Sequence, residues 1–238
     1  MPEVDVMAFG AHPDDIEICC GGTLIKLAQA GRSVVMVDMV RGEMGTRGTA
    51  ETRLAEAEEA RKIIGAVARE NLELDDGFLE VTRESKRRVA QVVRKYRPRL
   101  ALIPYYKGRH PDHYHASDIA YEGIFLAGLA RFDTGQEAHR PTKLLYYMTR
   151  QEFDPTFVVD ISAQFERKME AIYAYATQFR PEVGDWGQTR LTAPGFRTSL
   201  EHWMGYYGSM IGVAYGEGFI VRGTLAVDDP LNLTFASF

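Results

Sequence analysis

The chain contains little cysteine: its two cysteines, Cys19 and Cys20, are adjacent among 238 residues. Neighbouring residues in a helix cannot easily reach the geometry of a normal disulfide, so no disulfide framework is expected. Free thiols fit a reducing cytosol, and we therefore expect a cytoplasmic protein. We interpret both thiols as small buried hydrophobic side chains on a helix rather than as metal ligands.

The sequence also lacks long hydrophobic runs and any concentration of basic residues. No run of about 18 apolar residues is present, so no membrane-spanning helix is expected. Residues 1–5 contain neither the basic region nor the cleavage pattern of a secretory signal. The formal net charge is −5 and no basic stripe occurs, which argues against nucleic-acid binding.

What the sequence does contain is an alternation of strand-like and helix-like patterns. Hydrophobic residues make up 45% of the chain, enough for the core of one domain spanning residues 1–238. We predict strands over 4–9, 33–40, 71–74, 100–103, 144–148 and 157–161, and helices over 16–30, 51–64, 84–96, 117–132 and 162–177. This order predicts an α/β, Rossmann-like fold, a mainly parallel sheet with helices on both faces.

The last part of the chain, from about residue 179 to residue 238, differs in composition. It is rich in glycine and in aromatic residues such as Trp186, Phe196, Trp203 and Phe219. Aromatic-rich segments more often serve a core or an interface than a ligand site. We therefore interpret this segment as a C-terminal cap over the sheet edge, or as a surface between the subunits of an oligomer.

Four of the six histidines lie in two short clusters. The first cluster, residues 11–15, follows the first predicted strand, and the second, residues 110–115, follows the fourth. In parallel sheets ligands bind outside the carboxyl ends of the strands. Both clusters are therefore expected at the edge of the sheet where a site forms.

The first cluster suits a hydrolytic metal site, which needs three protein ligands, an open position for water and a base. His12 and Asp15 are three residues apart at the start of a helix, so both side chains can point at one metal ion. Asp14 lies between them and should point elsewhere, which leaves it free to act as the base.

The second cluster repeats this three-residue spacing with His110 and His113. One of the two completes the ligand set, and the other can donate a proton or stabilise an oxyanion, oriented by Asp112. We interpret His115 as a residue of the helix start, or as one that contacts the metal ligands without binding the metal itself. A single His-Pro-Asp turn would more often be structural, but two at one sheet edge favour a functional site.

These motifs resemble those of a known family. Ala-His-Pro-Asp-Asp at 11–15 and His-Pro-Asp-His at 110–113 are similar to the pattern of the LmbE-like (PIG-L) family of zinc-dependent N-acetylglucosamine deacetylases. The resemblance continues through residues 41–46, 51–53 and 203–219, so it spans nearly the whole chain. Within the family, the compact length and this ending most resemble the bacillithiol-biosynthesis deacetylases, which act on N-acetylglucosaminyl-malate.

The resemblance implies roles for the residues at matching positions. The zinc ligands would be His12, Asp15 and His113, although Fe(II), Co(II) or Mn(II) also suit two nitrogens and a carboxylate. Asp14 would be the general base. Protonated His110, supported by Asp112, would stabilise the tetrahedral intermediate.

Arg53 and Arg140 are similarly placed to family residues that face the substrate, and arginine is a natural partner for the two carboxylates of a malyl group. Without the resemblance, Arg53 would be interpreted as a surface arginine paired with Glu56 three residues on. Arg140 precedes a proline, where a solvated loop arginine is an equal alternative.

The glycine-rich loop over residues 41–48 matches neither a dinucleotide-binding fingerprint nor a P-loop. Its glycines are expected to let the backbone approach a sugar, with Glu43 or Thr46 binding the hydroxyls. A plain mobile loop is the alternative.

The resemblance therefore implies an enzyme that removes the N-acetyl group from N-acetylglucosaminyl-malate, releases acetate and works as a homohexamer. The sequence is also compatible with a deacetylase or amidase that acts on another N-acetylglucosamine conjugate. That conjugate could be inositol-linked, oligomeric or of the mycothiol type. A non-catalytic nucleotide-binding α/β module is a further alternative. A structural metalloprotein fits poorly, because structural zinc sites prefer closed, cysteine-rich shells and Asp14 and His110 would be idle.

Overall fold

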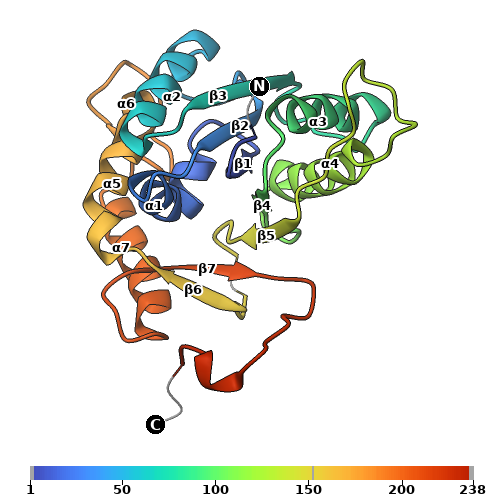
Figure 1. Ribbon diagram of the computed structural model, residues 1–238. Coiled ribbons are helices and arrows are strands. Elements are labelled where there is room, and N and C mark those ends of the chain that lie inside the picture. The colour runs from blue at the N-terminus through green and yellow to red at the C-terminus, as the bar shows by residue number, and fades with distance from the viewer. Residues whose placement is uncertain (1–2, 152, 236–238) are drawn as a thin grey trace.

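In the computed structural model, which describes residues 3–151 and 153–235, the chain is built around one seven-stranded sheet (Figure 1). The strand order is β3-β2-β1-β4-β5-β7-β6. The strands span Val6–Gly10 (β1), Val34–Val40 (β2), Ala68–Leu74 (β3), Leu100–Pro104 (β4), Lys143–Tyr147 (β5), Phe157–Asp160 (β6) and Gly216–Ile220 (β7). Neighbours among β1 to β5 run parallel, whereas β7 is antiparallel to both β5 and β6, so the mainly parallel sheet is confirmed.

Helices cover both faces of this sheet, as predicted. Figure 1 shows α3 (Arg83–Tyr96) and α4 (Pro111–Ala127) on one side, and α1 (Asp15–Gln29), α2 (Ala50–Ile64) and α5 (Phe165–Tyr173) on the other. Successive β1 side chains alternate between the two layers, because Met7 and Phe9 pack with α3 and α4 while Val6 and Ala8 pack with α1. The sheet is therefore buried on both faces, which explains its near-continuous hydrophobic strands.

Two helices differ from their predicted bounds. Helix α4 begins at Pro111, six residues before the predicted start, because His110 caps it and proline is favoured at the first helical position. The second histidine cluster therefore lies in the first turn of α4 rather than in a loop. The helix predicted over 162–177 is divided into a 3-10 turn (Ser162–Gln164), α5 and α6 (Ala176–Phe179).

The segment beyond residue 179 contributes to the core of the fold. It forms α7 (Phe196–Ser209) and strand β7, which lies inside the sheet between β5 and β6. Strand β7 was not predicted, because the glycines in Gly216-Glu217-Gly218 indicate a turn or loop rather than a strand. The glycine is required by packing: a Cβ at Gly216 would lie 2.5 Å from Cγ1 of Val158 and 2.9 Å from the backbone nitrogen of Gly208.

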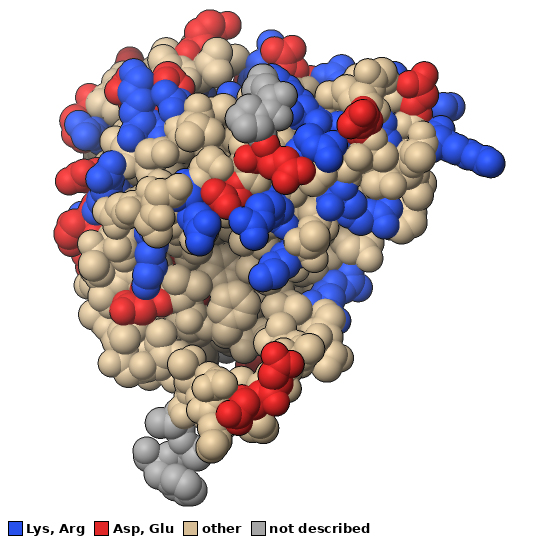
Figure 2. All heavy atoms as spheres, in the orientation of Figure 1, with Lys and Arg blue, Asp and Glu red and all other residues tan. Residues whose placement is uncertain are grey.

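The structure bears on three features that were considered from composition: the cysteines, the absence of membrane-spanning helices and the distribution of charged side chains. Cys19 and Cys20 are free and buried, as interpreted. Among the described residues, no helix is both long and apolar enough to cross a membrane. Basic and acidic side chains are interspersed on the face drawn in Figure 2.

A buried ion pair joins α5, β7 and α1. The Nζ of Lys168 lies 2.6 Å from Oε1 of Glu217, and neither side chain is exposed. The Glu217 carboxylate also accepts hydrogen bonds from the backbone nitrogens of Gly22 (2.9 Å) and Thr23 (2.7 Å). A Cβ at Gly22 would lie 3.0 Å from the same carboxylate, so the absence of a side chain lets α1 approach β7.

We predict that Lys168→Met lowers the free energy of unfolding by about 3–5 kcal/mol, because it leaves the buried Glu217 carboxylate without its cation. Chemical denaturation measures the loss. Lys62→Met is the matched control: its partner Glu59 lies on the surface, where solvent screens such pairs and they contribute little to the free energy of unfolding. Equal, small losses in both variants would contradict the prediction.

Candidate active site

The two histidine clusters meet at the carboxyl edge of the sheet. His12 lies in the turn after β1, Asp14 directly precedes α1, and Asp15 is the first residue of that helix. His113 lies in the first turn of α4, which follows the neighbouring strand β4. Adjacent parallel strands thus bring together side chains that are about one hundred residues apart in the chain.

Three side chains form a donor set that fits a divalent cation. Nδ1 of His12 lies 3.2 Å from Oδ2 of Asp15, and Nε2 of His113 lies 3.2 Å from Oδ1 of the same carboxylate. The donor atoms of all three residues lie within 4.8 Å of one another. Two imidazole nitrogens and a carboxylate are ligands that zinc and related metals accept. The structure therefore brings together the three residues that the resemblance implies as ligands.

The electrostatics of this set favour the ligating form of its carboxylate. Burial alone would raise the pKa of Asp15, but the charge and hydrogen bond of His113, together with those of His12, hold that pKa well below its ordinary value. Asp15 is therefore ionised at neutral pH, as a metal ligand must be.

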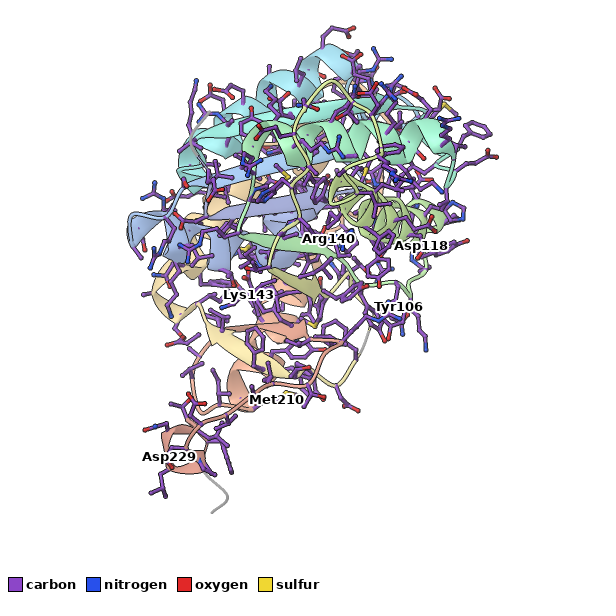
Figure 3. The ribbon with its side chains drawn as sticks, turned by 45° about the vertical axis from the view of Figure 1, so that its right-hand side comes forward. Tyr106, Asp118, Arg140, Lys143, Met210 and Asp229 are labelled. Carbon is purple, nitrogen blue, oxygen red and sulfur yellow. The ribbon has the colours of Figure 1, made fainter. Side chains whose placement is uncertain are left out.

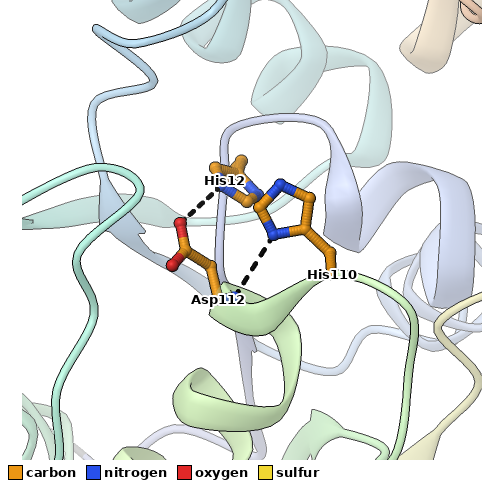
Figure 4. A group of neighbouring side chains, drawn as sticks. All are labelled: His12, His110 and Asp112. Carbon is orange, nitrogen blue, oxygen red and sulfur yellow. Dashed lines mark hydrogen bonds and ion pairs between the residues drawn. The ribbon is translucent and has the colours of Figure 1, made fainter.

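Asp112 has a different partner from the one expected. Its Oδ2 lies 3.2 Å from Nε2 of His12 and accepts a hydrogen bond from the backbone nitrogen of Gly77 at 2.9 Å (Figure 4). The carboxylate therefore orients His12, whose other ring nitrogen faces the donor set. His110 instead accepts a hydrogen bond at Nδ1 from the backbone nitrogen of Asp112, at 3.2 Å. The predicted support of His110 by the Asp112 carboxylate is wrong, because helix capping takes up that ring nitrogen.

Asp76 was missed in the sequence, although it lies in the same site. Its Oδ1 is 3.3 Å from Nε2 of His12, and its Oδ2 accepts a hydrogen bond from the backbone nitrogen of Met44 at 2.8 Å. Burial lowers the pKa of His12, but hydrogen bonds with Asp112, Asp15 and Asp76 raise it well above its ordinary value. The available signal was position: Asp76 follows β3, at the same edge of the sheet.

Asp14 is buried and held in a strained backbone conformation. Its φ of 116° lies in the left-handed region, and its side chain does not cap the helix that follows. Burial raises the pKa of Asp14 to about 7, with Asp15 adding to the shift and the positive charge of Arg53 opposing it. A carboxylate with a pKa near neutrality can accept a proton and return it, which is the property required of the predicted base.

Arg53 lies beneath this turn and is not a surface residue. It is 4% exposed, and its Nη2 donates to the carbonyl oxygen of Pro13 at 2.5 Å and lies 3.4 Å from Oδ2 of Asp14. The alternative pairing with Glu56 does not occur, because that carboxylate accepts hydrogen bonds from Thr177. Arg53 therefore holds Asp14 and the loop around it.

His110 is arranged to donate a hydrogen bond from its ring. Burial, followed by the positive charges of His12 and His113, lowers the pKa of His110 below its ordinary value, and the protonated form that the resemblance implies stays a prediction. Since its Nδ1 accepts a hydrogen bond from the backbone, the ring proton lies on Nε2. The ring of His110 stacks on that of His113, with centroids 5.0 Å apart.

The remaining predicted residues divide into two groups. Glu43 and Thr46 are exposed on the loop after β2, at the edge that carries the site. Arg140 is not brought to the site. Its Nη2 donates to the carbonyl oxygen of Phe125, near the far end of α4. Phe125 is twelve residues beyond His113, or about 18 Å along the helix.

Figure 3 illustrates this separation. Lys143, which begins β5 shortly after Arg140, and Tyr106, which follows β4, lie at opposite ends of the sheet. Residues that precede a parallel strand lie at its amino edge, so the position of Arg140 in this chain does not support the predicted substrate contact.

Comparisons with known proteins agree with this geometry. The family model described as PIG-L, GlcNAc-PI de-N-acetylase, matches residues 7–124. A diacetylchitobiose deacetylase from Thermococcus kodakarensis is 34% identical over 90% of this chain and 81% of its own length. A probable N-acetyl-alpha-D-glucosaminyl L-malate deacetylase from Bacillus anthracis is 27% identical over 76% of this chain and 84% of its own. The solved structure of a conserved protein from Thermus thermophilus superposes with a TM-score of 0.85 and 35% identity, covering 94% of this chain and 98% of that one.

We predict that His113→Ala loses bound metal, because the donor set retains only two of its three ligands. Metal content per chain after dialysis, measured by plasma mass spectrometry, tests this. His115→Ala is the matched control: two residues further along a helix, His115 points to the other side and is not part of the donor set. Unchanged metal stoichiometry in His113→Ala would remove His113 from the ligand set.

Proposed function

Because the chain belongs to the PIG-L (LmbE-like) family of deacetylases, we propose that it is a metal-dependent hydrolase that removes the N-acetyl group from N-acetylglucosaminyl-malate, a step of bacillithiol biosynthesis. The observation that carries the proposal is the convergence of His12, Asp15 and His113 beside a buried carboxylate, Asp14, whose pKa is raised to about 7. Acetate and the free amino sugar are the products.

The metal would be held by His12, Asp15 and His113, and we propose zinc, although Fe(II), Co(II) and Mn(II) suit the same donors. When bound, such an ion supplies a Lewis acid and a water molecule that ionises near neutral pH. Asp112 and Asp76 fix the orientation of His12 from behind, which tunes the affinity of the site.

The protein's own groups then move the protons. Asp14 accepts a proton from the attacking water and later donates it to the leaving amine nitrogen, for which a pKa of about 7 is suitable. The Nε2–H of His110 donates a hydrogen bond to the acetyl oxygen as that oxygen gains negative charge. Arg53 keeps the Asp14 carboxylate in place through its contacts with the turn.

A neutral chitooligosaccharide is the second candidate substrate, because the chain is 34% identical to the diacetylchitobiose deacetylase and 27% identical to the probable N-acetyl-alpha-D-glucosaminyl L-malate deacetylase. A homo-oligomer is also part of the proposal. It is supported by exposed hydrophobic side chains in the C-terminal segment, including Met210, Ile211, Leu231 and Phe235.

Acetate release tests the function. We expect metal-loaded protein to release acetate from N-acetylglucosaminyl-malate much faster than from free N-acetylglucosamine, and protein stripped by a chelator to release none until metal is restored. N,N′-diacetylchitobiose is assayed in parallel. Equal release from all three would retain the deacetylase and discard the malate assignment. Metal-loaded protein that releases acetate from none of them would refute the proposal.

Asp14→Asn separates catalysis from metal binding. We expect this variant to retain its metal, because Asp14 is outside the donor set, and to lose about a hundredfold to ten-thousandfold in kcat, because the proton carrier is removed. Metal content and acetate release are measured on the same sample. The exposed Asp228→Asn is the control. Full activity in Asp14→Asn would eliminate Asp14 as the base.

A further inference from the structure

One buried arginine that the proposed chemistry does not use organises a segment next to the site. Arg47 is 1% exposed and lies in the loop between β2 and α2. Its guanidinium group donates hydrogen bonds of 2.6–3.1 Å to five backbone carbonyl oxygens, those of Thr177, Arg180, Val183, Trp186 and Gly187. In return, the carbonyl oxygen of Arg47 accepts a hydrogen bond from Nε2 of Gln178 at 2.5 Å. The segment 177–187 is therefore wrapped around a side chain of the β2 loop, which fixes its position.

The β2 loop is itself attached to the site at two points. The backbone nitrogen of Met44 donates to Oδ2 of Asp76 at 2.8 Å, and Oδ1 of Asp76 lies 3.3 Å from Nε2 of His12. The carbonyl oxygen of Gly42 accepts a hydrogen bond of 3.4 Å from Nη1 of Arg53, which lies beneath the turn before α1. The loop therefore connects the metal donors with the segment that surrounds Arg47.

A second contact brings this segment against the part of the loop that was expected to bind sugar hydroxyls. A Cβ at Gly187 would lie 3.8 Å from Cγ2 of Thr46, an ordinary van der Waals distance. Thr46 is two residues beyond Met44, or at most about 7 Å along the chain. Trp186, the neighbour of Gly187, therefore lies at the rim of the site.

Trp186 is exposed to solvent, but its ring is held in place. The Cζ atom of Arg47 lies over the ring, 5.7 Å from its centroid. The ring also packs against Gly184, where a Cβ would lie 2.0 Å from an indole carbon, and the φ of 71° at Gly184 favours glycine as well. Trp186 nevertheless keeps 36% of its surface exposed. An aromatic side chain that is immobilised in advance loses little conformational entropy when a ligand packs on it.

We propose that Trp186 is a platform for the pyranose ring of a second sugar unit, which makes it a specificity-determining residue for a neutral disaccharide substrate. One face of a pyranose carries mainly C–H groups, and the burial of such apolar surface against an indole ring is favourable. The hydroxyl group of Thr46, on the loop beside it, can exchange hydrogen bonds with the hydroxyls of the same sugar.

The same geometry gives no advantage to a malyl group. A malyl group has two carboxylates and no ring to pack on Trp186. Arg47 has no donor left for a carboxylate, because the five bonds to carbonyl oxygens use all five of its N–H groups. The inference rests on the proposed deacetylation and gives the second candidate substrate a contact of its own.

The kinetic test compares substrates with and without a second ring. We expect Trp186→Ala to lower kcat/KM for N,N′-diacetylchitobiose about tenfold, through KM, and to leave N-acetylglucosaminyl-malate and N-acetylglucosamine nearly unchanged. Trp186→Phe should retain most of the wild-type value, because it keeps an aromatic plane. Tyr206→Ala removes an exposed aromatic ring from α7 and is the matched control. Equal losses on all three substrates, or no loss on the disaccharide, would overturn the platform.

Binding gives a readout that needs no turnover. The chain has two tryptophans, so Trp203→Phe leaves Trp186 as the only one. In metal-loaded protein that also carries Asp14→Asn, we expect N,N′-diacetylchitobiose to change the fluorescence of Trp186 in a saturable way. N-acetylglucosamine at the same concentrations should not change it. Calorimetry that detects binding of the disaccharide without a fluorescence change, or that detects no binding, would contradict the proposal.

Failure of the platform and failure of the deacetylase give different results. A saturable change in Trp186 fluorescence, in a protein that releases no acetate from any of the three substrates, would support the platform while refuting the deacetylase. Acetate release with a disaccharide preference that Trp186→Ala leaves unaltered would do the reverse.

Discussion

The pairing of β1 with β4 is the constraint on which the site depends. The two strands run parallel in a register that sets Val6 opposite Leu100 and Ala8 opposite Leu102. Their carboxyl ends therefore reach the same edge together, and the chain leaves each strand through a turn that starts a helix. His12 and Asp15 come from one such turn and His113 from the other. A shift in this register would separate the donors, because the contacts between the two turns, Asp15 with His113 and His12 with Asp112, form only when the two strands end together.

The edge of the sheet is divided by charge. Around His12, three carboxylates from three different segments, Asp15, Asp76 and Asp112, produce a region that suits a cation. Arg53 bounds this region beneath Asp14, where its positive charge opposes the effect of burial on the pKa of that carboxyl group.

The C-terminal part of the chain is fastened to the core of the fold. Strand β7 is joined to α1 and α5 by the buried pair of Glu217 and Lys168, and α7 packs against β7. Helix α7 contacts Arg150, which follows β5, through two aromatic rings and the hydroxyl group of Ser199. Arg47, in the loop after β2, donates hydrogen bonds to the carbonyl oxygens of Arg180 and Val183. Residues remote from the metal donors thus connect the C-terminal part of the chain to the carboxyl edge of the sheet.

The sequence by itself determined the alternation of strands and helices and the contents of each turn, because hydrophobic periodicity, capping and three-residue spacing are local properties. His12, Asp14 and Asp15 could be assigned to one site for that reason. Only the tertiary structure decided that Asp76 joins the site, that the Asp112 carboxylate contacts His12, and that β7 enters the sheet. It also placed Arg140 beside the carbonyl oxygen of Phe125, near the far end of α4. These outcomes depend on strand order and on packing between distant segments, for which a single sequence carries no local signal.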